Sequence, residues 1–172
     1  MTKRPLLSRP LDLTLLVYLL LHLLPCVLIN SAIYLPPSPL TAAANGAVDR
    51  WLEMSADPFV SAFVRGTGPK WYAAIMASEL FMEVPLMLYC IWAIPPDSPS
   101  WQIPGVIYAT QCVTTVPIIL YSLLTEHRDL PYDQTVTIAI ANVVFFILPL
   151  VMLYRCTLGW SVPSLPSKLK KH

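Results

Sequence analysis

Two glutamates, Glu79 and Glu83, lie in the stretch "SELFMEVPLMLYC" (78–90), which is otherwise almost wholly apolar. A charged side chain at the centre of a bilayer costs roughly 2.5–3.5 kcal/mol on insertion scales. A spacing of four places both carboxyl groups on one face of a helix. Two neighbouring carboxylates are costly to ionise in an apolar medium, so at least one is expected to be protonated near neutral pH. We therefore expect this face to point into a ligand-binding or catalytic pocket; the alternative is hydrogen bonding between helices.

The composition predicts a membrane protein. Hydrophobic residues make up 56% of the 172 residues and charged residues 12%, against about 45–50% and about 25% in globular domains. The mean hydropathy is +0.61. A membrane helix needs about 20 apolar residues. Four stretches are long enough and predict an all-α integral membrane four-helix bundle: about 11–35, 71–94, 103–124 and 135–154.

Each predicted span contains one proline: Pro25, Pro85, Pro117 and Pro149. Proline removes a backbone hydrogen bond and kinks a helix. Kinked helices can bow apart around an intramembrane ligand pocket, although prolines are also simply tolerated in membrane helices.

Polar residues at helical spacing on the other spans could complete such a pocket. Span one carries His22, Cys26 and Asn30; span three carries Tyr108, Gln111 and Thr115; span four carries Asn142. Each alone is more often a satisfied interior polar group. Together with the glutamates they predict a pocket for a flat apolar ligand with one polar end, such as a sterol, or for a lipophilic amine.

The Lys and Arg residues predict the orientation. One side of the membrane would carry seven basic residues, which lie in residues 1–10 and 156–172 or, for Arg155, directly before the second segment. The other side would carry four. Both segments flanking the membrane domain (11–155) are therefore expected in the cytosol. The final "KLKKH", with Lys168 and Lys170, matches the dilysine pattern by which coat proteins return membrane proteins to the endoplasmic reticulum. The alternative is a basic tail beside anionic lipid.

Other features exclude function classes. A net charge of +1 gives no reason to expect a nucleic-acid partner. The four cysteines have no paired or metal-like spacing and are interpreted as free thiols, so no metal or cofactor is expected. Membrane lipids are the expected surroundings, and a homodimer is left open.

Several motifs resemble a known family. "WYAAIMASELFMEVPLMLYCIWAI" and "IPGVIYATQCVTTVPIILYSLL" are similar to spans two and three of the sigma intracellular receptor 2 (transmembrane protein 97) family. That family belongs to the EXPERA superfamily, together with the emopamil-binding sterol isomerase. "HLLPCVLIN" and "DPFV" extend the resemblance to roughly residues 12–154. It implies a pocket that opens toward lipid, cholesterol handling, and binding of sterols or cationic amphiphiles in the endoplasmic reticulum.

The resemblance also assigns residues. The family's pocket Glu falls on Glu79, but its ligand-pairing Asp falls on Asn30, and a Gln one turn after the Glu becomes Glu83. The negative charge has thus moved from span one to span two, which puts transfer of drug affinity in doubt. The family's loop Asp falls on Asp57, for which a helix cap is at least as good an interpretation.

Two principal functions follow, with a purely structural membrane partner as a third. The first is a non-enzymatic binder of sterols or amines, acting as a receptor or trafficking regulator. The second is a sterol or terpenoid double-bond isomerase, with Glu79 and Glu83 as acid and base and His22 as a proton relay. Only four spans are expected here where the resemblance to the isomerase implies five, and the motifs match the receptor family better, so the binder is favoured.

Overall fold

The computed structural model describes residues 4–34 and 36–158, and within these ranges the chain forms helices and no strands. In chain order the elements are η1 (Leu6–Ser8), α1 (Pro10–Tyr34), α2 (Pro39–Ser55), α3 (Pro58–Val64), α4 (Lys70–Ser78), η2 (Glu79–Glu83), α5 (Val84–Ala93), η3 (Pro99–Trp101), α6 (Gln102–Glu126) and α7 (Tyr132–Thr157). The expectation of an all-α protein is confirmed.

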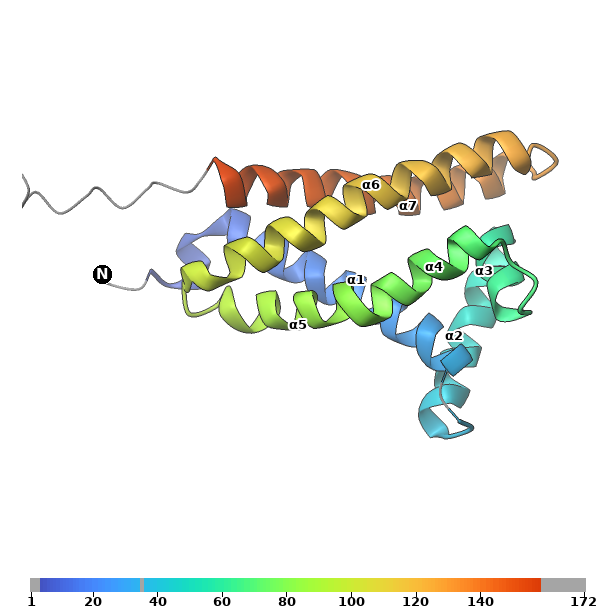
Figure 1. Ribbon diagram of the computed structural model, residues 1–172, viewed down its shortest axis with the longest axis horizontal. Coiled ribbons are helices and arrows are strands. Elements are labelled where there is room, and N and C mark those ends of the chain that lie inside the picture. Colours follow the sequence, from blue (N-terminus) through green and yellow to red (C-terminus); the bar gives the residue numbers. More distant parts are fainter. Residues whose placement is uncertain (1–3, 35, 159–172) are drawn as a thin grey trace, which may run out of the picture.

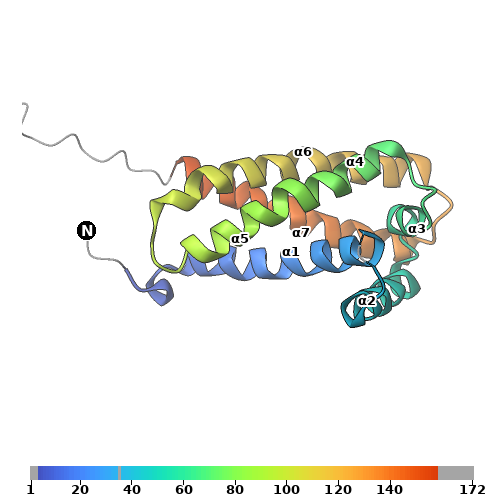
Figure 2. The same ribbon diagram turned by 60° about the horizontal axis from the view of Figure 1, so that its bottom comes forward.

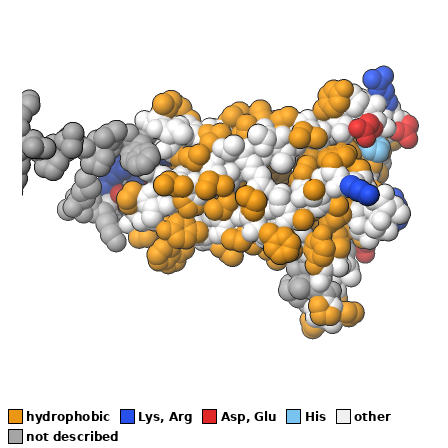
Figure 3. Space-filling view, in the orientation of Figure 1, with side chains coloured by type: hydrophobic (Ala, Val, Ile, Leu, Met, Phe, Trp, Pro, Cys, Tyr) orange, Lys and Arg blue, Asp and Glu red, His pale blue; other side chains and the backbone are white. Residues whose placement is uncertain are grey.

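Four helical stretches are long and apolar enough to cross a membrane: Pro10–Tyr34, Lys70–Ala93, Pro99–Glu126 and Tyr132–Thr157. The second consists of α4, η2 and α5 in succession. Figures 1 and 2 show these stretches running along one elongated bundle, with α6 beside α7. Apolar side chains cover the bundle's flank, and charged ones gather towards its ends (Figure 3). The protein is therefore a multi-pass membrane helix bundle, as the sequence predicted.

The helices pack closely around two apolar clusters. One cluster includes Leu15, Met87 and Tyr108 near the end where the described chain starts, and the other includes Phe59 and Ile138. Gly105 lets α6 and α7 pack closely, because a Cβ there would lie 2.9 Å from Met152 Cε and 3.1 Å from Cys156 Sγ. A larger residue would force these side chains to shift.

A network of ion pairs ties the helix ends together where the described chain starts and α7 ends (Figure 1). The buried Arg9 donates to Asp12 Oδ2 at 2.8 Å and also lies 3.1 Å from Asp97. Arg155 of α7 donates from Nε to Asp12 Oδ1 at 2.8 Å. Arg9 also donates to the carbonyls of Ile94 and Pro95 at 3.0 Å. The network thus joins α1 to α7 and to the loop after α5.

At the opposite end, α2 and α3 cover the bundle (Figure 1). Ser38 and Thr41 form a capping box that begins α2. Ala56 takes a left-handed conformation (φ 49°) that ends α2 and lets α3 begin two residues later. The Asp57 carboxylate caps α3 by accepting from the amides of Phe59 and Val60 at 3.0 and 3.1 Å. This turn brings Trp51 and Asp57 over the interior.

Candidate functional site

A cavity of about 380 Å³ lies between the bundle and the covering helices. Its walls come from α1, α2, α3, α4, η2, α6 and α7, and most of its lining is apolar or aromatic. His22, Cys26, Asp57, Tyr72, Glu79 and Asn142 supply its polar groups. A concave apolar site with a few convergent polar groups is typical of a small-molecule pocket, which usually measures about 300–1,000 Å³.

Glu79 enters the cavity from an unusual segment of backbone. η2 (Glu79–Glu83) is a π-helical turn, in which the Val84 N–H bonds to the Glu79 carbonyl, five residues earlier. Pro85 follows at once and has no N–H to continue the normal ladder. Such π turns recur at functional sites. The turn separates the two glutamates: Glu79 lines the cavity beside the Cys26 thiol, whereas Glu83 does not line it.

Glu83 instead lies in the core of the bundle, where it is 2% exposed. The Cys112 thiol of α6 donates to Glu83 Oε2 at 3.6 Å. The potential ligand atoms of His22, Glu83 and Cys112 all lie within 4.8 Å of one another. The two glutamates both point inward, but to adjoining places rather than to one shared face.

Two tyrosines hold His22. The hydroxyl groups of Tyr18 and Tyr108 both contact Nδ1 of the imidazole, and Tyr108 donates to Tyr18 at 2.8 Å. The ring also stacks on Phe145 with 4.3 Å between centroids. His22 therefore has a fixed orientation between the cavity, which it lines, and the buried Glu83.

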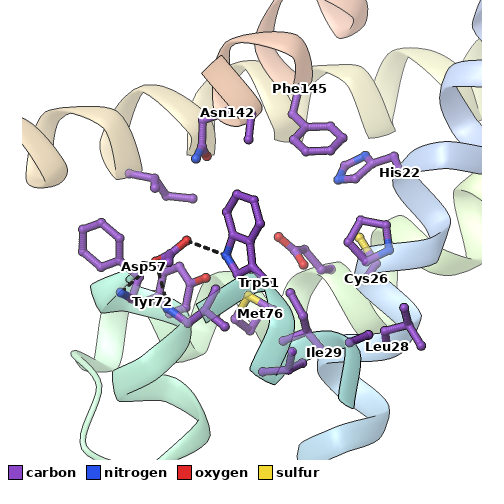
Figure 4. A pocket seen from close by; sticks show the side chains of 18 residues that line it. His22, Cys26, Leu28, Ile29, Trp51, Asp57, Tyr72, Met76, Asn142 and Phe145 are labelled. Atoms are coloured by element: carbon purple, nitrogen blue, oxygen red, sulfur yellow. Dashed lines mark hydrogen bonds between the residues drawn. The ribbon is translucent and has the colours of Figure 1, made fainter. Parts of the chain in front are cut away.

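The far wall of the cavity carries a second carboxylate. Asp57 accepts from Trp51 Nε1 at 3.2 Å while it caps α3, and Figure 4 shows both side chains at the cavity with Tyr72 and Met76 nearby. Burial raises the pKa of Asp57, and the hydrogen bonds from Val60, Trp51 and Phe59 offset part of that rise. Asp57 is thus both a helix cap and a cavity residue.

The sequence of this helix bundle matches a known protein family. A family model described as EBP, or EXPERA (EXPanded EBP superfamily), matches residues 43–156. The chain belongs to the EXPERA superfamily. The match includes the segments that supply Trp51, Asp57, Tyr72, Glu79 and Asn142 to the cavity. Among the cavity's polar residues, His22 and Cys26 on α1 precede the matched segment.

Of the eight residues that the sequence predicts for the pocket of this EXPERA protein, three line the cavity: His22, Glu79 and Asn142. The Asn142 amide donates to the Ile138 carbonyl at 2.9 Å and comes from the wall opposite α1 (Figure 4). Glu83 and Tyr108 lie one layer deeper, in contact with residues around His22.

The other three predicted residues do not line the cavity. Asn30 donates to the Cys26 carbonyl at 2.7 Å, and Thr115 donates to the Gln111 carbonyl at 3.0 Å, so both bond to their own helix. Gln111 donates to the Ser78 hydroxyl at 2.6 Å and joins α6 to α4. Periodicity placed these residues on inward faces but could not distinguish a cavity wall from a helix contact.

Sequence patterns did not reveal that α2 and α3 contribute to the cavity wall. For the stretch 36–70, which contains Trp51, the sequence predicts only short interfacial helices that cap the bundle, and it explains Asp57 equally well as a helix cap. The "DP" pair marks a helix start, and nothing in its spacing shows that the same carboxylate faces a cavity. Only the sharp turn between α2 and α3 brings it there.

Proposed function

We propose that this protein binds an apolar small molecule with a polar or cationic end, a sterol or a lipophilic amine, in the cavity beside Glu79. The observation that carries the proposal is the apolar cavity with the Glu79 carboxyl group in its wall and no Lys or Arg among its lining residues. A half-buried carboxyl group without a cationic partner can accept from a ligand hydroxyl group or pair with a ligand ammonium group. Membership of the EXPERA superfamily supports a lipid-type ligand.

The cavity suggests how the ligand lies. Tyr72, Met76 and Phe145 offer aromatic and apolar surface to a rigid ring system, and Glu79 is placed to hydrogen-bond its polar end. Asn30 is neutral and lies outside the lining, so an amine would pair with Glu79 rather than with span one. We infer a role in sterol or lipid homeostasis or trafficking, without chemistry on the ligand.

A photoreactive sterol probe on the purified protein in detergent tests this proposal. The Glu79→Gln variant keeps the shape of the side chain but removes its charge, and we expect it to lose about tenfold in labelling efficiency. Glu126→Gln, at an exposed glutamate near the end of α6, is the matched control and should label like wild type. Labelling that neither Glu79→Gln nor excess sterol reduces would overturn the proposal.

A second candidate function is double-bond isomerisation of a sterol or terpenoid. It is favoured by one observation, namely that His22 lies between the cavity and a second carboxyl group, Glu83. Glu79 and Glu83 would then act as acid and base, with His22 as relay. Incubation with a Δ8-sterol followed by mass spectrometry separates the two functions. We expect no isomerised product above background, and turnover that is lost in Glu79→Gln would establish the enzyme.

The proposed location is the endoplasmic reticulum membrane with both termini in the cytosol. The proposed signal, Lys168 and Lys170, lies outside the described residues. Changing both lysines to serine in a fluorescently tagged chain should let it pass beyond the endoplasmic reticulum, if coat proteins bind this tail. Crosslinking in the same cells would test for the homodimer.

A further inference from the structure

A buried cluster in the bundle brings together three residues that are typical metal ligands. His22 comes from α1, Glu83 from η2 and Cys112 from α6, and all three are buried, with 7%, 2% and 2% of their surfaces exposed. Their ligand atoms lie within 4.8 Å of one another. In the sequence these residues are far apart, so no ligand spacing is visible there.

The distances suit a tetrahedral metal ion. Zn²⁺ binds thiolate sulfur at about 2.3 Å and nitrogen or oxygen at about 2.0–2.2 Å. Tetrahedral angles then place sulfur and oxygen ligands about 3.6 Å apart, and an imidazole nitrogen at a similar distance from each. Cys112 Sγ and Glu83 Oε2 are 3.6 Å apart. All three ligand atoms are therefore within about 1 Å of the positions that the ion requires.

The charges favour a divalent cation. Within residues 4–34 and 36–158, every ion pair involves Arg4, Arg9 or Arg155, and Glu83 takes part in none. A carboxylate, a thiolate and a neutral imidazole together carry two negative charges, which one Zn²⁺ ion balances. The zinc-bound assembly would therefore be neutral, which limits the cost of keeping its ligands in an apolar core. Nitrogen and sulfur ligands select Zn²⁺ over Mg²⁺ or Ca²⁺.

The surroundings of His22 are those of a metal ligand. A metal-bound histidine usually donates its second ring N–H to a neighbouring oxygen, which fixes the ring. The hydroxyl groups of Tyr18 and Tyr108 lie at Nδ1, so Nε2 would be the nitrogen that binds the ion. We propose that His22, Glu83 and Cys112 form a zinc site, with a fourth position for water or for a ligand from the adjoining cavity.

Zinc binding to the full-length protein without a polyhistidine tag tests the site. After treatment with a chelator and addition of Zn²⁺ alone, elemental analysis should find about one retained ion per chain. Cys112→Ala and Glu83→Gln should each weaken the affinity at least about tenfold. Cys90→Ala is the matched control, because Cys90 is equally buried in the same core but bonds to the Trp101 carbonyl. It should bind zinc like wild type.

Cobalt gives a spectroscopic readout of the same site. Co²⁺ bound by the wild-type chain should show the near-ultraviolet band of a thiolate ligand and the visible bands of tetrahedral geometry. Absence of the thiolate band, or the same band and affinity in folded Cys112→Ala, would overturn the zinc site. These measurements use no sterol, and sterol labelling can be done in chelator, so the site and the proposed function can fail separately.

Discussion

Asp12 and the pair Glu79 and Glu83 are inward-facing carboxyl groups that are compensated in opposite ways. At one end of the bundle, Asp12 accepts from Arg155 Nε at Oδ1 and from Arg9 at Oδ2, both at 2.8 Å. In the middle of the bundle, Glu83 accepts from the Cys112 thiol at 3.6 Å, and Glu79 faces a cavity. The first arrangement is complete and holds helices together. The second leaves carboxyl groups able to bind something else.

The largest effect on stability should come from breaking the ion-pair network around Asp12. Asp12→Ala leaves the buried Arg9 guanidinium without its carboxylate partner on α1 and releases Arg155 from α1. Removing one member of a buried ion pair typically costs 3–5 kcal/mol, so we expect a loss of about 3–5 kcal/mol in the free energy of unfolding. Chemical denaturation in detergent measures it, with the exposed Asp49→Ala as control. A loss below about 1 kcal/mol would show that the network holds nothing together.

Asp57 represents an intermediate case, because amides and an indole rather than guanidinium groups compensate it. Asp57→Ala removes the cap of α3 and should cost about 0.5–2 kcal/mol, whereas Asp57→Asn keeps an acceptor and should cost less. Thermal unfolding of both variants measures the difference. Equal losses would mean that the charge, not the cap, is what α3 needs.

The pH dependence of stability sharpens this intermediate case. Burial raises the pKa of Asp57 in the folded state, so the folded state binds a proton more tightly than the unfolded state, whose pKa is about 3.9. Stability from this group is therefore present below about pH 3.9 and is lost as the pH rises through the folded pKa. As the pH rises through this window, the unfolding temperature of wild type should fall relative to that of Asp57→Asn. At higher pH the difference between the two unfolding temperatures should stay constant. A constant difference from pH 3 to 7 would contradict this assignment.

The smallest effect on stability is expected at Glu83. In the zinc-free protein, Glu83→Gln replaces a carboxyl group that has no cationic partner with a neutral amide of the same shape. We expect an unchanged or slightly higher unfolding temperature, because the amide avoids the cost of burying a charge. Thermal unfolding in the presence of a chelator measures this. A loss above about 2 kcal/mol in the free energy of unfolding would mean that a partner stabilises the Glu83 carboxylate, and Glu83 would then not differ from Asp12.

The sequence predicted the four membrane helices well, because their bounds depend on local hydropathy and length. It also singled out Glu79 and His22, since ionisable residues in apolar stretches need an inward-facing place. It failed for Arg9 and Arg155, which were treated only as topology signals. Their partner Asp12 is close to Arg9 in the chain but distant from Arg155, so the complete network could not be recognised.

By itself, then, the sequence determined that the chain crosses the membrane as helices and that Glu79 and Glu83 must avoid lipid, because transfer free energies act residue by residue. The tertiary structure decided what each carboxyl group meets. A π turn before Pro85 directs Glu79 to the cavity and Glu83 to Cys112, and the turn at Ala56 brings Asp57 above them. These contacts join residues on different helices, whose relative rotation and depth are set by packing rather than by any local pattern.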